Sequence, residues 1–536
     1  MSAPTNKLNT RAAGVVGLAV MCSRVLGLVR EVLFGMLFGG GRSMDAFIMA
    51  FKTPNLLRDM FAEGALSTAF ITTFSKKIER EGVPAAWKLA NKVGTLLVIF
   101  MSIVSVLGVI AAPLLLSITA SGFRTDPEKF ALTVHLAQIM FPFILLVSLG
   151  AQVMGILNAR NVFGIPAMAS SFFNIGSIIG GVALAWWIDP SFGPRALYGL
   201  AVGTLIGGAL QLAVQLPSLY RLGYRFHFDF DWRDPGVGDV LRQMGPAIIA
   251  ASSVQVNVMI NGAFASWLED GTAYRLTVAF RLMQLPLGLF GVALGTVTLP
   301  LVSRMAAQGN MAGFSGALSR GMRLALLLTI PSTVGLVLLA RPIIGLIYEH
   351  GNFSAHAADQ AALGLQGYAL GLCAYSALKV LTPAFYAIDR RRTPMMIGFL
   401  SIAINCGLNY LFAFVFKLGI HGLGLATGCV ATLNFVLLYW LMRRATGQLQ
   451  TRQFIVTAVK LIIPAALLVG ICWLASATVL SGWHALPLWQ KAVRLFTTIG
   501  LGGAAYFGSA MLFRIEEIQD LTALVKRKLL RRPAGA

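Results

Sequence analysis

Fourteen apolar stretches, each about twenty residues long, are the feature that most constrains the fold of this chain. Twenty helical residues rise about 30 Å, which matches the hydrocarbon core of a bilayer, so each stretch is long enough to cross a membrane. Their centres fall near residues 25, 60, 102, 145, 177, 208, 255, 290, 332, 370, 404, 430, 466 and 502. The sequence therefore predicts an all-α polytopic membrane protein with about 14 transmembrane helices.

Composition supports the membrane class and argues against several others. The 536 residues are 57% hydrophobic and 12% charged, whereas a soluble chain averages about 25% charged residues. The net charge of +22 comes mainly from Lys and Arg in short loops, where they set topology and contact anionic membrane lipids, so we expect no nucleic-acid partner. The five cysteines and six histidines are scattered. We therefore expect no disulfide, no metal site and no catalytic residue.

The basic loops alternate along the chain and predict its orientation. Loops that follow the even-numbered spans are rich in Lys and Arg, and the opposite loops are poorer. The basic groups lie at residues 76–92, 160, 221–242, 304–323, 390–392, 443–452 and 526–532. By the positive-inside rule both termini are cytoplasmic. The end of the chain can form a basic amphipathic helix on the inner leaflet or serve only as a topology anchor.

The chain also matches itself at a shift of about 228 residues. Gln138 and Pro166 meet Gln366 and Pro394 at 228 residues, and Lys52 meets Arg281 at 229. This shift covers six helices, an even number, so the two copies should share one orientation and be related by a pseudo-two-fold axis along the membrane normal.

The repeat predicts four parts of the chain. Two six-helix lobes are followed by helices 13 and 14 and by a basic cytoplasmic tail. The expected boundaries are 1–225, 226–446, 447–514 and 515–536. In this class of fold, one lobe rocks against the other around a site near the bilayer midplane, which alternates access between the two sides.

Five cations sit inside the apolar stretches: Arg24, Arg30, Lys52, Arg58 and Arg281. A charge at mid-bilayer costs about 2.5–3.5 kcal/mol on the translocon scale, so the five should not face lipid. The simplest arrangement is a water-filled cavity lined with positive charge. Such a cavity suits an anionic substrate, for example a phosphate or a diphosphate.

A structural role for these cations is the alternative. Glu31, Asp59 and Glu63 are close enough in sequence to pair with some of them, and Arg58 is followed at once by Asp59. Both interpretations stay open for Arg58. Arg24 and Arg281 have no acidic neighbour at i±3 or i±4, which favours a role in facing the ligand.

No nucleotide-binding motif accompanies these cations. Gly39–Gly41 is expected to be a flexible outer loop, because no strand precedes it and no Gly-Lys-Ser/Thr occurs in the chain. We expect no ATP hydrolysis and no cofactor. The energy should come from a sodium or proton gradient, the membrane potential or the gradient of the substrate itself.

Five segments together resemble the MurJ (MviN) family of lipid II flippases, within the multidrug/oligosaccharidyl-lipid/polysaccharide exporter superfamily. They cover nearly the whole chain: SRVLGLVREVLFGMLFG, DAFIMAFKTPNLLRDMFAEGALSTAF, MGPAIIAASSVQVNVMINGAFAS, FRLMQLPLGLFGVALGTVTLPLVS and ALKVLTPAFYAIDRRRTPM. The resemblance implies a transporter, not an enzyme. Its substrate would be lipid II, the undecaprenyl-diphosphate-linked peptidoglycan precursor, moved from the cytoplasmic to the outer leaflet.

The resemblance also implies site residues. The cavity arginines of the family fall on Arg24, Arg30, Arg58 and Arg281, and a functionally important outer-loop aspartate falls on Asp45. Lys52 and Glu63 are expected to support them. The family also implies a groove near the last two helices for the lipid tail.

Some relatives bind sodium in the C-terminal lobe through acidic and amide side chains. Here the eleventh span offers Asn405 and Asn409 without a carboxylate, which argues against a sodium site of that kind.

Three other functions remain open at this point. The chain could be a flippase for another polyprenyl-diphosphate-linked glycan. It could be a cation-coupled drug exporter of the same fold, although such a cavity should hold carboxylates instead of arginines. It could also be a non-transporting scaffold that recruits cell-wall synthesis enzymes, whose buried arginines would then be structural ion pairs. Such enzymes are also candidate partners of a flippase.

Overall fold

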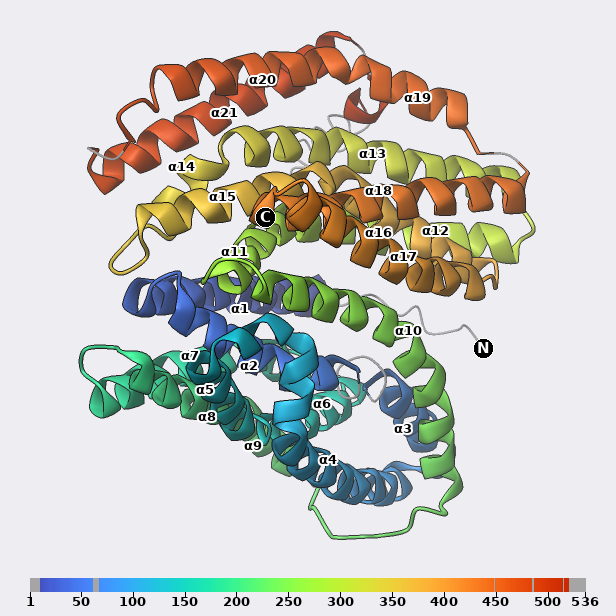
Figure 1. Ribbon diagram of the computed structural model, residues 1–536. Helices are drawn as coiled ribbons and strands as arrows, with labels where there is room; N and C mark the ends of the chain where they lie inside the picture. Colours follow the sequence, from blue (N-terminus) through green and yellow to red (C-terminus); the bar gives the residue numbers. More distant parts are fainter. Residues whose placement is uncertain (1–9, 61–66, 448, 484–485, 514, 520–536) are drawn as a thin grey trace, which may run out of the picture. The chain divides into compact units, whose positions relative to one another are not determined.

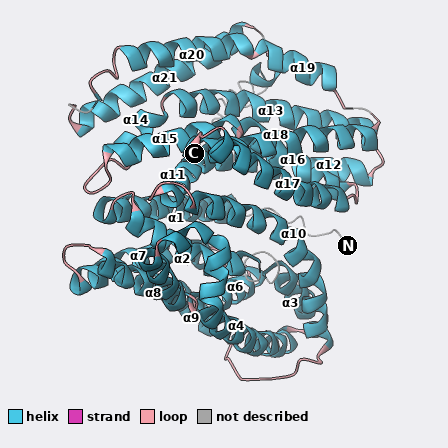
Figure 2. Ribbon diagram, in the orientation of Figure 1, coloured by secondary structure: helices cyan, strands magenta, loops and turns pink. Residues whose placement is uncertain are grey.

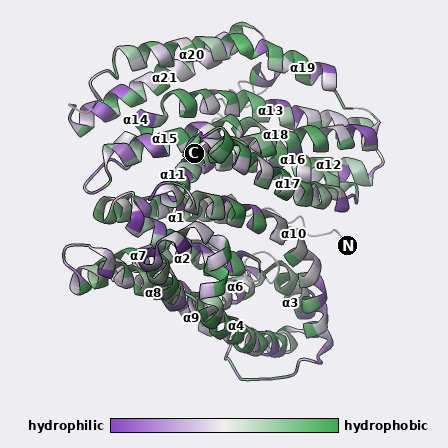
Figure 3. Cartoon of the chain, in the orientation of Figure 1, coloured by the Kyte–Doolittle hydropathy of each residue, from purple (hydrophilic) through white to green (hydrophobic). Residues whose placement is uncertain are grey.

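The computed structural model describes residues 10–60, 67–447, 449–483, 486–513 and 515–519, and every regular element in these ranges is a helix (Figure 2). Hydrophobic residues run along most of these helices (Figure 3). The chain divides into two compact units. Unit 1 holds Met1–Tyr274 and Gly351–Phe353, and unit 2 holds Arg275–His350 and Ser354–Ala536. The four-part division predicted from the repeat stays a prediction.

The transmembrane helices account for most of the predicted spans. Among the described residues, ten helical runs are long and apolar enough to cross a membrane, and an eleventh is a pair of helices bent by 44°, Ala355–Leu370 and Leu372–Ala387. The other predicted spans correspond to α1 and α10 and to the segment of α2 and α3, on either side of residues 61–66. Because these three segments are not among the runs that are long and apolar enough to cross a membrane, the exact number of fourteen stays a prediction.

In its described residues, unit 1 contains the first ten α-helices and two short 3₁₀ turns (Figure 1). The helices are α1 (Thr10–Phe38), α2 (Arg42–Arg58), α3 (Ser67–Glu81), α4 (Val83–Thr119), α5 (Pro127–Met140), α6 (Phe143–Ala159), α7 (Gly164–Ile188), α8 (Leu197–Ala213), α9 (Leu216–Arg221) and α10 (Pro235–Ser266). The 3₁₀ turns are η2 (Ser121–Thr125) and η3 (Pro194–Ala196). Small residues bring α7 and α8 close together. A Cβ on Gly203 would lie 2.2 Å from the Cα of Gly181, so a larger residue there would force the helices apart.

Unit 2 contains most of α11 (Thr272–Pro286) and everything described after it except Gly351–Phe353. The elements are η4 (Leu287–Val292), α12 (Ala293–Ala307), α13 (Met311–Leu338), α14 (Ala340–Ile347), α15 (Ala355–Leu370), α16 (Leu372–Ala387), α17 (Arg392–Tyr410), η5 (Leu411–Val415), α18 (Gly419–Thr446), α19 (Thr451–Lys460), α20 (Ile462–Ala477) and α21 (Leu488–Leu512). Both η4 and η5 are π-helical.

The internal repeat is visible in the helix boundaries of the two units. Helices α5, α6 and α7 begin at residues 127, 143 and 164, and α15, α16 and α17 begin at residues 355, 372 and 392, which are shifts of 228, 229 and 228. One hydrogen bond repeats with them. The Gln138 side chain donates to the carbonyl oxygen of Val109 at 3.1 Å, and the Gln366 side chain donates to that of Val337, 228 residues later in both partners, at 3.0 Å.

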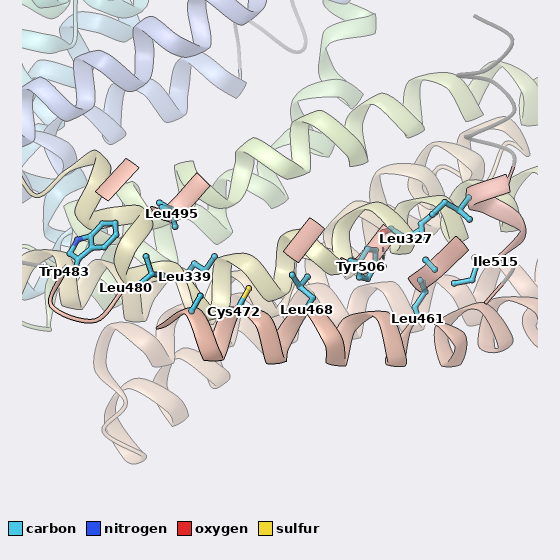
Figure 4. Close-up of a cluster of buried hydrophobic side chains, with 13 residues drawn as sticks. Leu327, Leu339, Leu461, Leu468, Cys472, Leu480, Trp483, Leu495, Tyr506 and Ile515 are labelled. Atoms are coloured by element: carbon cyan, nitrogen blue, oxygen red, sulfur yellow. Dashed lines mark hydrogen bonds between the residues drawn. The ribbon is translucent and has the colours of Figure 1, made fainter. Parts of the chain in front are cut away.

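The two helices outside the repeat pack inside unit 2. Figure 4 shows the apolar cluster that joins α20 and α21 to α13. The buried Tyr506 of α21 donates its hydroxyl hydrogen to the carbonyl oxygen of Leu327 on α13 at 3.0 Å. Leu461 and Leu468 fill the space on the α20 side. A second cluster, around Phe314 and Phe385, lies between α13, α16 and α18.

Candidate cation site

Helix α1 carries the first two predicted cations. Arg24 lies at its midpoint, fourteen residues from Thr10 and fourteen from Phe38, so each end of the helix is about 21 Å away along the axis. Its side chain is exposed and has no ion-pair or hydrogen-bond partner among the described residues. Arg30 is half-buried, with its guanidinium carbon 5.0 Å from the centre of the Phe173 ring on α7. A cation over an aromatic face is attracted by the ring, which orients Arg30.

The neighbouring helix α2 carries Lys52 and Arg58, both half-buried. The guanidinium of Arg58 pairs with the Asp59 carboxylate at 2.7 Å through Nη2 and at 3.1 Å through Nε, which is one of the two roles that the sequence leaves open. The other carboxylate oxygen of Asp59 accepts from Asn55 and from Gln255 of α10, both at 3.4 Å. Asp59 therefore fixes the direction of Arg58 and still leaves both side chains partly exposed.

Asp45 lies in the first turn of α2, so its predicted place in an outer loop is wrong. Only 1% of its surface is exposed, because three donors surround it. Its carboxylate accepts from the backbone N–H groups of Gly271 at 2.7 Å and Tyr274 at 3.0 Å, and it pairs with Lys129 of α5 at 3.1 Å. Asp45 thus neutralises the partial positive charge at the start of α11.

Lys129 completes this buried cluster. It is 3% exposed, pairs with Asp270 at 2.6 Å and lies 3.8 Å from the centre of the Phe123 ring. Since each charge in the cluster has a partner of opposite sign, the arrangement satisfies the requirement that buried ions be paired and hydrogen-bonded. The cluster of Asp45, Lys129 and Asp270 is therefore a structural clamp that holds α2, α5 and the beginning of α11 together.

The connection between α1 and α2 is also different from the expectation. The Gly39–Gly41 run is a short turn and not a flexible loop: Gly39 and Gly40 are buried, and the Gly39 N–H donates to the carbonyl oxygen of Gly35 at 2.8 Å. Gly39 has a φ of +78°, and a Cβ there would lie 2.9 Å from the carbonyl oxygen of Asn352. Both facts require glycine at this helix end.

In unit 2, Arg281 lies on α11, half-buried, one turn before Pro286 and the π-helical turn η4. Such π-helical turns are frequent at functional sites. Close packing fixes η4, because a Cβ on Gly291 would lie 3.0 Å from the Cα of Ser376 on α16. Arg281 thus lies on the helix that leads into this closely packed turn.

Two further sets of predicted residues have different outcomes. Glu63 lies outside the described residues. Asn405 and Asn409 are buried on α17, and Asn409 donates to the side-chain oxygen of Asn405 at 3.2 Å. The described part of the chain contains no group of three or more His, Cys, Asp and Glu side chains placed to hold a metal ion.

The sequence interpretation missed the partners of Asp45 and of Arg30. Neither Lys129 nor Phe173 is among the residues that the sequence singles out. Asp45 and its partners are separated by 84 to 229 residues along the chain. The pairing therefore depends on tertiary packing, and no local motif announces it.

A helical membrane protein with single cations carried on rigid helices can bind an anion inside the membrane, because guanidinium groups offer several N–H donors to phosphate oxygens. Fold and charge together define a polytopic transporter. Comparisons with known proteins make this specific. The family model described as Lipid II flippase MurJ matches residues 34–490, and the chain belongs to that family.

Individual relatives cover nearly the full length. The "Lipid II flippase MurJ" of Burkholderia cenocepacia is 34% identical over 503 residues, covering 93% of this chain and 96% of the relative. The "Probable lipid II flippase MurJ" of Vibrio cholerae is 31% identical over 517 residues, covering 95% and 97%.

Solved structures agree on the fold. A structure titled "Lipid II flippase MurJ, inward closed conformation" matches with a TM-score of 0.75 at 24% identity, covering 92% of this chain and 99% of the other. An inward-facing multidrug resistance MATE family transporter of the MOP superfamily matches with a TM-score of 0.66 at 14% identity, covering 81% and 98%. At these identities the structures speak for the fold alone.

Proposed function

We propose that this chain is a flippase that moves lipid II from the cytoplasmic to the outer leaflet by alternating access. The observation that carries the proposal is the 34% identity to the Burkholderia cenocepacia lipid II flippase over 93% of the chain. Lipid II combines a diphosphate, a sugar-peptide headgroup and a long polyprenyl tail. The headgroup is the part that must be shielded from lipid during transfer.

In this proposal Arg24, Arg30, Arg58 and Arg281 bind the diphosphate and the headgroup. A guanidinium forms paired, charge-assisted hydrogen bonds with phosphate oxygens, which a lysine does less specifically. Arg24 supports this role best, because an exposed cation at the middle of a membrane helix is costly unless it faces water or an anion. Lys52 adds positive charge on α2.

We assign Asp45 a supporting role away from the substrate. Its three donors already use both of its carboxylate oxygens. A negative charge would also repel a diphosphate. Asp45 therefore serves transport by holding the start of α11, the helix that carries Arg281.

Orientation and energy coupling form part of the same proposal. The basic loops favour cytoplasmic termini in a bacterial inner membrane, and anionic lipids are expected to contact these loops. The driving force would be a sodium or proton gradient or the membrane potential, with no cofactor. The hydrogen bond between Asn405 and Asn409 occupies one of the amide groups that a sodium site there would use.

One alternative function is disfavoured by the charges. A cation-coupled drug exporter binds cations, so it should carry carboxylates on its exposed helix faces. The candidate site of this chain instead carries arginines and a lysine, which would repel a cationic drug. A flippase for another polyprenyl-diphosphate-linked glycan would use the same arginines. A lipid II flippase and a flippase for another glycan therefore differ only in which lipid accumulates when the protein is depleted.

Depletion of the protein in its host tests the proposal. The expected result is that lipid II accumulates on the inner leaflet, measured by extracting lipid-linked intermediates and by their accessibility to a reagent restricted to one side. Accumulation of another polyprenyl-diphosphate glycan would reassign the substrate. Normal lipid II distribution, with cell-wall enzymes mislocalised, would support the scaffold alternative and contradict the flippase.

A further inference from the structure

A second polar site lies in unit 2, far along the chain from the cations discussed above. It is a cavity of about 240 Å³ between α19 and the segment 515–519 that follows α21. Its lining includes Arg452, Thr457 and Lys460 of α19, together with Glu516 and Glu517. A single buried water needs only about 10–15 Å³, so the cavity has room for a larger polar group.

The floor of the cavity is a fixed carboxylate. Glu517 is 2% exposed, and one of its oxygens accepts from the guanidinium of Arg323 on α13, which is itself buried. Arg323 also donates to the side-chain oxygens of Gln450 at 3.2 Å and Gln453 at 3.0 Å. Arg323 is therefore held by three acceptors, and it holds Glu517 in one place.

The second oxygen of Glu517, Oε2, is buried and has no hydrogen-bond partner among the described residues. Leaving a buried polar atom unpaired costs about 1–3 kcal/mol, and more for a charged group. Glu517 is also one of the residues that line the cavity. The arrangement therefore calls for a hydrogen-bond donor, preferably a positively charged one.

The rim of the cavity carries the opposite charge. Arg452 and Lys460 are both exposed, and they stand eight residues apart on α19, about 12 Å along its axis. Their long side chains can reach across part of that distance toward a common anion. Three exposed apolar residues, Ile455, Val456 and Val459, lie on the same helix. Such a helix is typical of a membrane interface.

We propose that this cavity binds the headgroup of a phosphatidylethanolamine lipid. The ammonium group would donate to Oε2 of Glu517, and the phosphate would accept from Arg452 and Lys460. Two carbons join the ammonium and the phosphate in this headgroup. One ligand can therefore donate to Glu517 and accept from Arg452 and Lys460 at the same time. The basic loops place this end of α19 on the cytoplasmic side, which makes it an inner-leaflet lipid.

Other phospholipids fit the charges less well. Phosphatidylcholine has the same net charge, but its quaternary nitrogen carries no N–H and cannot donate to Glu517. Phosphatidylglycerol has hydroxyl donors, but it brings an uncompensated negative charge next to Glu516 and Glu517. The bound lipid would act as a wedge between α19 and the chain after α21, independently of lipid II.

Native mass spectrometry of the full-length protein in detergent tests this proposal. The three phospholipids are added in turn with identical acyl chains. We expect phosphatidylethanolamine to bind about tenfold more tightly than phosphatidylcholine, as one charge-assisted hydrogen bond implies. The variant R452Q/K460Q should lose about tenfold in affinity for phosphatidylethanolamine. The control R443Q, an exposed arginine near the end of α18 that does not line the cavity, should match the wild type.

A second variant tests the floor separately. E517Q should remove the preference for ethanolamine over choline, because the side chain then carries no negative charge for the ammonium. If E517Q does not fold, the proposal is still tested by comparing the lipid affinities of the wild type with those of R452Q/K460Q. Equal binding of ethanolamine and choline lipids to the wild type, a preference for phosphatidylglycerol, or full affinity in R452Q/K460Q would each overturn the proposal.

Discussion

Helix α2 of unit 1 and helix α11, which leads into unit 2, are repeat counterparts at a shift of 229, yet they differ in charge. Lys52 of α2 corresponds to Arg281 of α11, so a cation is kept at this position. Asp45 corresponds to Tyr274, and Arg58 corresponds to Leu287. The two copies thus share one cation, and each carries charges that the other lacks: Asp45 and Arg58 on α2, and Arg275, which corresponds to Ala46, on α11.

The packing of the copies is much more alike than their charges. The hydrogen bond from Gln138 to Val109 has its equivalent from Gln366 to Val337. In contrast, Lys129 of α5 corresponds to Ala357 of α15, so the buried clamp exists in one copy only. The difference teaches that the repeat preserves helix contacts, while the functional charges have been placed separately on each copy.

The largest effect is expected from breaking the clamp that distinguishes unit 1. Asp45→Ala leaves Lys129 buried with one partner fewer and leaves two backbone N–H groups without their acceptor. We expect a loss of about 3–5 kcal/mol in stability, seen as a lower thermal unfolding midpoint in detergent. The double variant Asp45→Asn with Lys129→Met should lose less than the sum of the two single variants. Additive losses would show that the two residues do not act as a unit.

A smaller effect is expected from exchanging the cation that the two copies share. Lys52→Arg places the residue of α11 on α2, and we expect transport close to the wild type. Lys52→Leu should reduce transport about tenfold, because one charge near the headgroup is worth about 1 kcal/mol or more. Transport is measured by complementation of depleted cells at equal protein levels. Equal activity of the Leu and Arg variants would remove Lys52 from the site.

Equal and modest effects are expected where the copies pack alike. Gln138→Leu and Gln366→Leu each remove one side-chain hydrogen bond. The carbonyl oxygen that accepted it then has no side-chain donor, so each variant should lose about 1–2 kcal/mol in stability. The measurement is the thermal unfolding midpoint of each variant. Midpoints that differ widely between the two variants would break the equivalence of the two copies.

The smallest effect concerns pH at the N-terminal end of α5, where unit 1 has Asp126 as the helix N-cap and unit 2 has Ser354 at the equivalent place in α15. The backbone N–H of Lys129 and the nearby Arg42 lower the pKa of Asp126. Since its folded pKa lies below the ordinary value of about 3.9, its stabilisation is complete above that pH and is lost as pH falls through the folded value. The unfolding midpoint of Asp126→Asn should therefore depend less on pH below about 4 than that of the wild type. An identical pH dependence would contradict this assignment.

Much of the fold follows from hydropathy and from the repeat. The fourteen apolar centres match helices or helical segments, and the Gln138 and Gln366 match marks a real packing equivalence. The pairing of Arg58 with Asp59 was also readable, because the two residues are adjacent. What sequence reasoning missed depends on distant partners. The family resemblance implies an outer-loop position for Asp45. The three glycines before it form a tight turn instead, so α2 begins at Arg42 and includes Asp45.

The clamp and the lipid cavity could not be predicted for the same physical reason. Lys129 and Glu517 look like ordinary loop or tail charges, and only packing shows that each is buried against a charge of opposite sign. The sequence shows which residues are charged and which of them fall inside apolar stretches. It does not show which of them meet.

The most direct test of the account is the position of lipid II in cells that depend on Arg24→Ala or Arg281→Ala. These residues represent one cation from each unit. The account predicts that both variants reach the membrane at wild-type levels and that lipid II accumulates on the inner leaflet as it does on depletion, while Arg24→Lys and Arg281→Lys restore part of the transfer. Normal lipid II distribution in both alanine variants would contradict it.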